Sequence, residues 1–336
     1  MIWAVLIIGA VLVAALQLTT ADKALAALHA DRKPCAILAE PNTPMGIRVT
    51  LENRSRRIIP FAAVRCSLPF SKEGQFSFSA WLLPRQRLQR EVPVSIPRRG
   101  RYVLEDMQVA CGDFLGLKES EKTCGSFREI VVAPQPLASA PLQTMVGGFL
   151  GDVSTRRFIM EDPVLTLGYR EYTGTEPMKR IAWNQTARHG MLMVKQNDYT
   201  VDPSVSVLLN VDTDLENREE ALEACFSAAR TVCAMLEEKG IRYSFSSNTM
   251  LLGKKHDNSG VAGLGRRHFD AILEVLGRAG SESVISLDQL LEQELQQVDR
   301  SGRILITPGG SEEASRFLLR MRQAEGLLVI RGKEVC

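Results

Sequence analysis

The chain opens with an uninterrupted apolar run. The first 20 residues, MIWAVLIIGAVLVAALQLTT, contain no charged side chain, and the first charge is Asp22. About 20 apolar residues are what a helix needs to cross a bilayer. No Lys or Arg precedes the run and only a poor cleavage site follows it, which favours an anchor over a cleaved signal peptide. The pattern predicts a transmembrane helix over 1–20, in contact with membrane lipid, and a juxtamembrane segment over 21–33.

Short runs in which apolar and polar residues alternate dominate the region 34–133. These runs are CAILAE, GIRVTLEN, FAAVRCSL, LQREVPVSI, RYVLEDMQVA and FREIVVAP, and turn residues separate them. Spacing and alternation of this kind predict a small β-sandwich over 34–133. The next stretch, APQPLASAPLQTMVGG, is rich in Pro, Ala, Ser and Gly and shows no periodicity. It is therefore expected to be an interdomain linker over 134–150.

Strands and helices alternate from about Val201 onward. SVSVLLNV is a continuous apolar strand of the kind buried on both faces of a parallel sheet. NREEALEACFSAARTVCAMLEEKG follows as an amphipathic helix that ends at Gly240. The later strand-like and helix-like segments are IRYSFSS, RRHFDAILEVLGRAG, SLDQLLEQELQQV, GRILITPGG, SEEASRFLLRMRQAEG and LLVIR. This alternation predicts a doubly wound α/β sheet with right-handed crossovers, in a domain over 151–336.

One stretch of the second domain, 167–195, concentrates aromatic and basic side chains. Its sequence is LGYREYTGTEPMKRIAWNQTARHGMLMVK. Rings as large as those of tyrosine and tryptophan usually need burial, so the stretch is expected to be a packed, structured insertion. Its candidate functional residues are Tyr169, Arg170, Glu171, Tyr172, Arg180, Trp183 and Arg188.

Two roles are open for these residues. In an architectural role, Tyr172 and Trp183 pack under the sheet while arginine side chains satisfy buried acceptors. In a functional role, the stretch presents a partner surface at the sheet edge. Arg180 and Arg188 are then the interaction anchors, because arginine is enriched at binding hot spots. The two roles are compatible with each other.

The same residues resemble the signature of a known family. The matching positions, in order, are Tyr169-Arg170-Glu171-Tyr172, Arg180-Ile181, Trp183, Ala187-Arg188 and Leu192-Met193-Val194. They resemble domain of unknown function 58, a family of bacterial membrane-tethered proteins with a von Willebrand A-like domain, often encoded beside MoxR-type AAA+ ATPases. Where that family usually has Gly-Asp, this chain has Gly174-Thr175-Glu176. Glu176 is the residue that would substitute for the acidic position.

The resemblance has implications for fold, partner and metal binding. It implies a membrane-anchored β-sandwich followed by a von Willebrand A-like domain, with a MoxR-type AAA+ ATPase as the protein partner. In von Willebrand A domains the first strand ends in Asp-x-Ser-x-Ser, which binds a divalent cation at the carboxyl edge of the sheet. Here both serines are missing, and the candidates for a degenerate metal site are Asp212 and Asp214. A metal-dependent adhesion or ligand-binding module that faces outward is therefore the alternative function.

Composition and charge bear on the kind of partner and on the cellular compartment that we expect. The net charge is +2, so no overall electrostatic argument supports nucleic-acid binding, and the aromatic residues are too few for stacking platforms. The 7 cysteines, an odd number at scattered positions, suit a reducing compartment. Basic residues outnumber acidic ones just after the apolar run, at Lys23, Arg32 and Lys33. This excess predicts a single-pass cell-membrane protein whose soluble domains face the cytoplasm.

The sequence offers no support for catalysis. It contains no P-loop, no dinucleotide fingerprint after a strand and no nucleophile elbow. The 4 histidines lack a Cys or His at ligand spacing, which leaves a zinc site unsupported. Helix-start patterns at Thr213-x-x-Glu216 and Asn217-x-x-Glu220 explain the degenerate metal motif without a cation. The sequence therefore predicts a non-enzymatic, membrane-tethered adaptor that needs no cofactor and binds protein, not nucleic acid.

Overall fold

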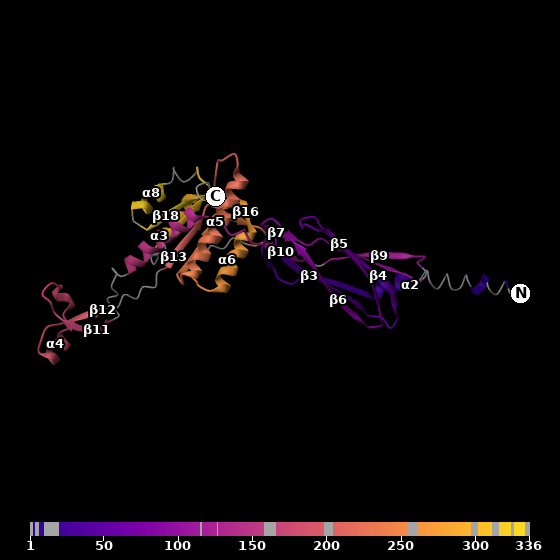
Figure 1. The fold of residues 1–336 in the computed structure, drawn as a ribbon, viewed down its shortest axis with the longest axis horizontal. Coiled ribbons are helices and arrows are strands. Elements are labelled where there is room, and N and C mark those ends of the chain that lie inside the picture. The colour runs from indigo at the N-terminus through magenta and orange to yellow at the C-terminus, as the bar shows by residue number, and fades with distance from the viewer. Residues whose placement is uncertain are drawn as a thin grey trace. The chain divides into compact units, whose positions relative to one another are not determined.

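The computed structural model of this chain describes most of its length (Figure 1). The described residues are 3, 7–9, 20–114, 116–125, 127–157, 166–197, 204–254, 261–296, 302–310, 316–323 and 326–332. Contacts divide the chain into two compact units. Unit 1 comprises Met1–Gln135 with Leu273–Arg278, and unit 2 comprises Pro136–Ile272 with Ala279–Cys336.

Unit 1 contains a short helix and three small sheets. The helix is α2 (Thr20–Ala27). The first sheet is antiparallel, in the order β1-β3-β6, with β1 Leu28–Pro34, β3 Pro44–Asn53 and β6 Arg87–Ser95. The second, also antiparallel, is β5-β4-β8-β9, with β5 Gly74–Leu82, β4 Ile59–Leu68, β8 Met107–Gly112 and β9 Glu119–Cys124. The third is β2-β10-β7, with β2 Leu38–Ala39, β10 Glu129–Val132 and β7 Gly100–Val103.

Alternation along the strands determines the core of unit 1. In β3, Val49 and Leu51 are buried, whereas Arg48 is exposed. Successive side chains of a strand point to opposite faces, so β3 turns one face inward. Val49 and Leu51 belong to one cluster of buried residues with Val64 of β4 and Val109 of β8. The two antiparallel sheets therefore share a hydrophobic core.

Unit 2 is organised around a parallel sheet. Its strand order is β14-β13-β17-β18, with β14 Arg242–Ser247, β13 Ser204–Leu209, β17 Gly302–Thr307 and β18 Leu327–Arg331. Its helices include α3 Ala140–Arg157, α5 Arg218–Glu238, α7 Leu287–Leu295 and α8 Arg316–Gln323, and α6 (Arg266–Arg278) is shared with unit 1. Two short strands, β15 (Thr249–Leu251) and β16 (Ala279–Ser283), pair separately.

Burial explains why the central strands of this sheet read as apolar runs. Leu208 of β13 and Leu305 of β17 cluster with buried residues of α7 and α8. The long helix α5 contacts β13, β14 and β17 and buries Leu222, Phe226 and Leu236 among its apolar positions. The strand and the amphipathic helix expected from the two segments after Val201 are confirmed by β13 and α5.

The predicted transmembrane helix over 1–20 is contradicted. Most of 1–19 lies outside the described residues, and among those that are described no helix is long and apolar enough to cross a membrane. The expected juxtamembrane segment over 21–33 instead forms α2 and most of β1. Asp22 of α2 pairs with Lys118 at 2.6 Å, and Ala21 and Ala24 are buried. These findings overturn the prediction of a single-pass membrane protein and the location derived from it.

The predicted fold class is also wrong. In place of a transmembrane helix, a β-sandwich and a doubly wound von Willebrand A-like domain, the described chain is mixed α/β with six small sheets. Four strands form the parallel sheet of unit 2, whereas β15 and β16 pair with each other in antiparallel fashion. Apolar patterning shows which face of a strand is buried but does not specify its partner. The separate pair of β15 and β16 was therefore not expected from the pattern.

A helix stands where a linker was expected over 134–150. The helix α3 covers Ala140–Arg157, and its residues Leu142, Val146, Leu150 and Val153 are buried. Their spacing of four, four and three places them on one face of a helix. Pro, Gly, Ser and Ala dominate the composition around them. Because this composition is typical of linkers, the sequence did not indicate the apolar stripe of a helix.

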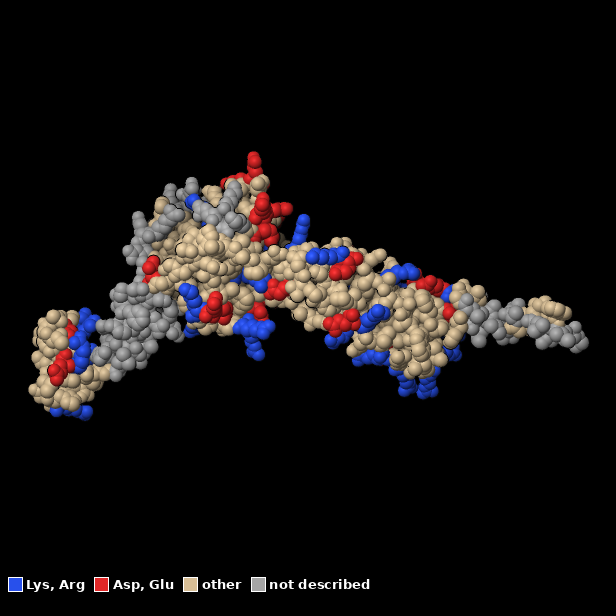
Figure 2. Space-filling model, in the orientation of Figure 1, with Lys and Arg blue, Asp and Glu red and all other residues tan. Residues whose placement is uncertain are grey.

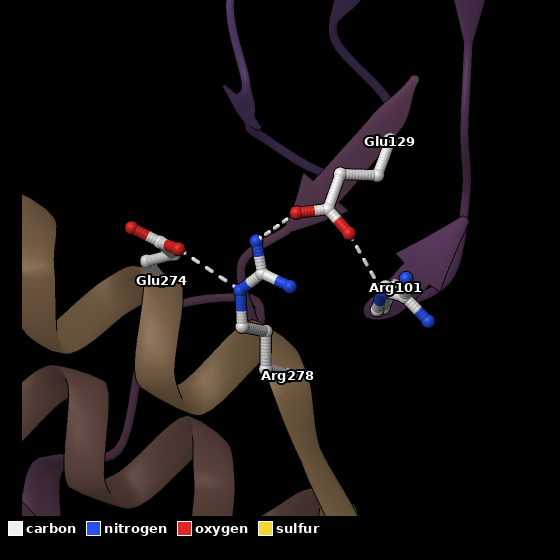
Figure 3. A network of polar contacts seen from close by, with 4 residues as sticks. All are labelled: Arg101, Glu129, Glu274 and Arg278. Carbon is white, nitrogen blue, oxygen red and sulfur yellow. Dashed lines mark hydrogen bonds and ion pairs between the residues drawn. The ribbon is translucent and has the colours of Figure 1, made fainter. Parts of the chain in front are cut away.

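Unit 1 contains a network of charged side chains around the buried Arg278 (Figure 3). The Arg278 side chain, at the end of α6, is 5% exposed and lies between two carboxylates. Its Nη2 donates to Glu129 Oε1 and its Nε donates to Glu274 Oε1 at 2.9 Å. Arg101 Nε donates to the second oxygen of Glu129 at 2.7 Å. The hydrogen bond from Arg278 is the main cause that lowers the pKa of Glu129 to about 2, and Arg101 adds to it.

We expect Glu129→Gln to destabilise β10 and the strands that it pairs with. A charged hydrogen bond contributes about 1.5–3 kcal/mol, and the variant removes the negative charge that pairs with both Arg278 and Arg101. Native-state hydrogen exchange at Val131 and Val132 measures the local free energy of opening. The pKa of Glu129 is lower in the folded chain than its ordinary 4.5, so its contribution is complete above about pH 4.5 and is lost as the pH falls toward 2.

The exposed pair between Arg65 and Glu121 provides a matched control. Its side chains are 57% and 51% exposed and lie 3.4 Å apart. Exposed pairs contribute roughly 0–1 kcal/mol, so Glu121→Gln should change exchange at Val131 very little. Equal effects of the two substitutions would contradict the assignment of the Glu129 network as a stabilising element.

Candidate functional site

The stretch singled out by sequence folds as a hairpin that encloses two short helices. Strand β11 (Thr166–Glu171) pairs antiparallel with β12 (Met193–Asn197), which sets Tyr169 opposite Lys195. The 3-10 helix η1 (Met178–Arg180) and the helix α4 (Trp183–His189) lie between the strands in sequence. We refer to residues 166–197 as the motif module.

Backbone contacts fold the two short helices onto β12. Ala182 N donates to Met193 O at 2.8 Å, and Ile181 forms a bridge with Val194. Thr186 Oγ1 accepts a hydrogen bond from Met193 N at 3.0 Å. The helix α4 ends at Gly190, whose φ of 69° is left-handed and therefore suits glycine. Ile181, Ala182 and Val194 are buried and form the small core of the module.

Glu176 organises the first turn of the module. Its carboxylate accepts hydrogen bonds from Thr173 Oγ1 at 2.8 Å and from Thr173 N at 3.1 Å. Arg170 Nη2 lies 2.7 Å from Glu176 Oε1, and the Glu176 side chain is only 8% exposed. The hydrogen bond from the Thr173 side chain is the main cause that lowers the pKa of Glu176 to about 2, with the Arg170 charge as a further cause. Glu176 lies where the chain departs from the family pattern, and it thus pairs with Arg170, which matches that pattern.

The module leaves its largest apolar side chains exposed. Trp183 is 60% exposed and Tyr169 is 44% exposed. Met178, Met191 and Leu192 are exposed as well. The architectural role, in which Trp183 packs under the sheet, does not fit this exposure, while Tyr172 is half-buried. Among the side chains of the module that the structure describes, Ile181, Ala182 and Val194 are the buried ones, and they cannot cover rings of this size.

Basic side chains accompany the exposed apolar ones. The module carries five Lys or Arg and two Glu, which gives it a net charge of +3 (5 − 2). Arg188 and Lys179 are exposed, and Arg180 is half-buried. Of the two acidic residues, Glu176 is paired with Arg170, and Glu171 is exposed. Figure 2 shows Lys and Arg side chains on the visible surface of this module.

The second candidate site lies where the strands of the parallel sheet end. Asn210 follows β13, Asn248 follows β14 and Thr307 ends β17, and all three are fully buried. Asn210 Nδ2 donates to Thr307 Oγ1 at 3.2 Å, and Asn248 Nδ2 donates to Asn210 Oδ1 at 2.8 Å. Sequence reasoning missed these residues, although Asn210 and Thr307 are polar residues at the ends of largely apolar strands.

This network changes the interpretation of Asp212 and Asp214. Asn248 Oδ1 accepts from Val211 N at 2.9 Å, which directs the amide nitrogen of Asn248 toward Asp212 Oδ2 at 3.1 Å. An N–H donor therefore occupies a position in which a cation would be needed. Asp214 is exposed, and the described residues contain no group of three or more His, Cys, Asp or Glu that could hold a metal. The expected capping at Asn217 is not observed, because its side chain accepts no cap hydrogen bond.

Comparison with known proteins adds little. No protein-family model and no curated protein matches this chain. Among solved structures, the CARDB domain of a Pyrococcus furiosus protein in complex with di-metal ions is 14% identical, covers 31% of this chain and 91% of its own, and has a TM-score of 0.24. The alkylpurine DNA glycosylase AlkC of Pseudomonas fluorescens is 10% identical, with coverages of 32% and 30% and a TM-score of 0.22.

A third structure covers more of the chain. The GH20 exo β-N-acetylglucosaminidase of Vibrio harveyi is 8% identical, covers 84% of this chain and 58% of its own, and has a TM-score of 0.21. At such scores none of these likenesses supports a conclusion about fold or function.

We expect Glu176→Gln to loosen the first turn of the motif module. The substitution removes the carboxylate that pairs with Arg170 and accepts from Thr173. Amide exchange at Thr173 should accelerate in the variant. Because the pKa of Glu176 is about 2 in the folded chain, below its ordinary 4.5, wild-type protection should hold above about pH 4.5 and fall toward pH 2.

The neighbouring Glu171→Gln is the control for this experiment, since Glu171 is exposed at the end of β11. It should leave exchange at Thr173 unchanged. If Glu176→Gln exchanged at the wild-type rate, Glu176 would not organise the turn.

Proposed function

We propose that this chain is a non-enzymatic interaction protein that binds a protein partner through the motif module. The observation that carries the proposal is the exposure of Trp183, Tyr169 and Met178 on a small, internally hydrogen-bonded scaffold. Clustered exposed apolar side chains are typical of interaction surfaces on soluble proteins. Tryptophan, tyrosine and arginine are also the residues enriched at binding hot spots.

The charge of the module supports a partner with acidic character. With a net charge of +3 and one of its two glutamates paired, the module attracts negatively charged surfaces. Arg188 suits the role of anchor because its side chain is exposed at the end of α4. Arg180 is half-buried and contributes more to the scaffold.

A MoxR-type AAA+ ATPase is the partner that the sequence resemblance implies, and we propose it as the first protein to test. The resemblance rests on residues that lie within the module, from Tyr169 to Val194. The proposal of binding through the module does not depend on this identity, because it follows from exposure and charge.

The alternative function, a metal-dependent adhesion or ligand-binding module, has weaker support. It requires Asp212 and Asp214 to hold a cation at the end of β13. The Asn248 amide donates to Asp212, and both Asn248 and Asn210 are fully buried. Binding of a cation would require this hydrogen-bond network to rearrange.

We predict that Trp183→Ala weakens capture of the ATPase by the purified full chain on the order of 30-fold. This corresponds to about 2 kcal/mol, the loss typical of a hot-spot residue. Arg188→Ala should weaken capture less, on the order of 5-fold, which corresponds to about 1 kcal/mol. Surface plasmon resonance against an immobilised MoxR-type ATPase measures both changes.

Trp81→Ala is the matched control, because Trp81 is 65% exposed on β5 of unit 1. It should bind as the wild type does. Undiminished capture by a correctly folded Trp183→Ala variant would exclude the motif module as the binding surface. Absence of any wild-type binding would exclude this partner.

A further inference from the structure

Unit 1 contains a buried arginine whose hydrogen-bonding capacity is largely unused. Arg32 lies on β1 and is 2% exposed. Its Nη1 donates to Cys66 Sγ at 2.8 Å. Its Nε and Nη2 are buried and have no hydrogen-bond partner among the described residues. The two groups lie on the same edge of the guanidinium plane.

Such an arrangement is costly for a folded domain. Arginine remains charged in proteins, and a buried charge needs a partner that neutralises it. Cys66 does not provide one, because burial raises the pKa of its thiol above the ordinary 9.0 and keeps it uncharged at neutral pH. The contrast with Arg278 is direct, since that buried guanidinium has carboxylates on both sides.

Arg32 lines a cavity of about 340 Å³ between β1 and the end of β9. Leu28 and Met107 form buried parts of its wall, and His29, Thr123 and Gly125 are exposed lining residues. Among the described strands, β1 pairs with β3 alone and lies at the edge of its sheet. The cavity is therefore lined by a buried cationic residue, by buried apolar side chains and by exposed residues. Its volume falls in the range of roughly 300–1,000 Å³ that is typical of small-molecule sites.

A second cation lines the same cavity. Lys122 Nζ donates to the carbonyl oxygens of Leu25 and Leu28, the former at 2.7 Å. An ammonium group has three donors, so these two bonds leave one for a further acceptor.

Two carboxylates adjoin the cavity without neutralising Arg32. Asp31 accepts from the backbone N–H of Arg32 at 2.9 Å and lies 3.5 Å from Lys33 Nζ. Asp106 packs against Gly125, where an added Cβ would lie 1.8 Å from its Oδ1. Neither bonds to Nε or Nη2 of Arg32. Both donors are unsatisfied but closed off from solvent, so a group from outside the chain reaches them only when the Arg32 side chain turns toward the cavity.

We propose that this cavity binds a small organic oxyanion, a carboxylate or a phosphate ester. Once the Arg32 side chain turns toward the cavity, the anionic head accepts two parallel hydrogen bonds from its Nε and Nη2, a geometry that the planar guanidinium matches to carboxylate and phosphate oxygens. The third proton of Lys122 supplies a further donor at the same end. The organic body contacts Leu28 and Met107. This site is separate from the motif module and does not depend on the proposed protein partner.

The test is calorimetric titration of the full chain with benzoate, phenyl phosphate and inorganic phosphate. Saturable binding of benzoate or of phenyl phosphate is expected, and the stronger of the two identifies the head group. Inorganic phosphate should bind more weakly than phenyl phosphate because it lacks the apolar body. Arg32→Met should weaken binding on the order of 10-fold to 100-fold, as expected for loss of charged hydrogen bonds.

Arg48→Met is the matched control, since Arg48 lies on the adjacent strand β3 with a side chain that is 53% exposed. It should bind as the wild type does. Arg32→Met should fold at least as stably as the wild type without ligand, because it removes an unpaired buried charge.

A measurement on the wild type keeps the proposal testable if the Arg32→Met variant does not fold. The Nε–H resonance of Arg32 in a nitrogen-15 correlation spectrum should shift in proportion to occupancy of the site. Binding that Arg32→Met retains, an Arg32 resonance that does not move at saturation, or no saturable binding of either organic probe would each overturn the proposal.

Discussion

The small size of the core in the motif module determines what the rest of that module can do. Ile181, Ala182 and Val194 are the buried apolar residues among its described side chains, and they cannot cover an indole ring or the side chains around it. The module is held instead by backbone hydrogen bonds to β12 and by the carboxylate of Glu176. Polar contacts of this kind fix the scaffold while they leave Trp183 and Met178 outside it. These exposed side chains are therefore suited to binding a partner rather than to packing inside the module.

The sequence predicted the elements of unit 2 better than their arrangement. The apolar run of β13 and the stripe of α5 were predictable because burial imposes a period on each segment. Helix α3 was not, because its stripe from Leu142 to Val153 lies among proline, glycine and serine. Strand partners were not predictable either. The pairing of β15 with β16 joins segments far apart in the chain, and nothing local encodes it.

Prediction of the candidate sites was likewise uneven. The residues of the motif module were found because aromatic and basic types are concentrated there. Their exposure was not predicted, since tyrosine and tryptophan are usually buried and the size of the module's core cannot be read from its sequence. Asn210 and Asn248 were missed because amide side chains after a strand are common, and only their geometry shows that they bond to each other and to Asp212. Arg32 was counted only as a charge following the apolar run, and its burial is a tertiary property.

The central claim is that the exposed side chains of the motif module bind a protein. Oxidative footprinting of the full chain, free and saturated with the MoxR-type ATPase, tests it without any substitution. The account predicts that oxidation of Trp183 and Met178 slows in the complex, whereas oxidation of Trp81 on β5 continues at the same rate. Unchanged oxidation of Trp183 in a saturated complex would contradict the account.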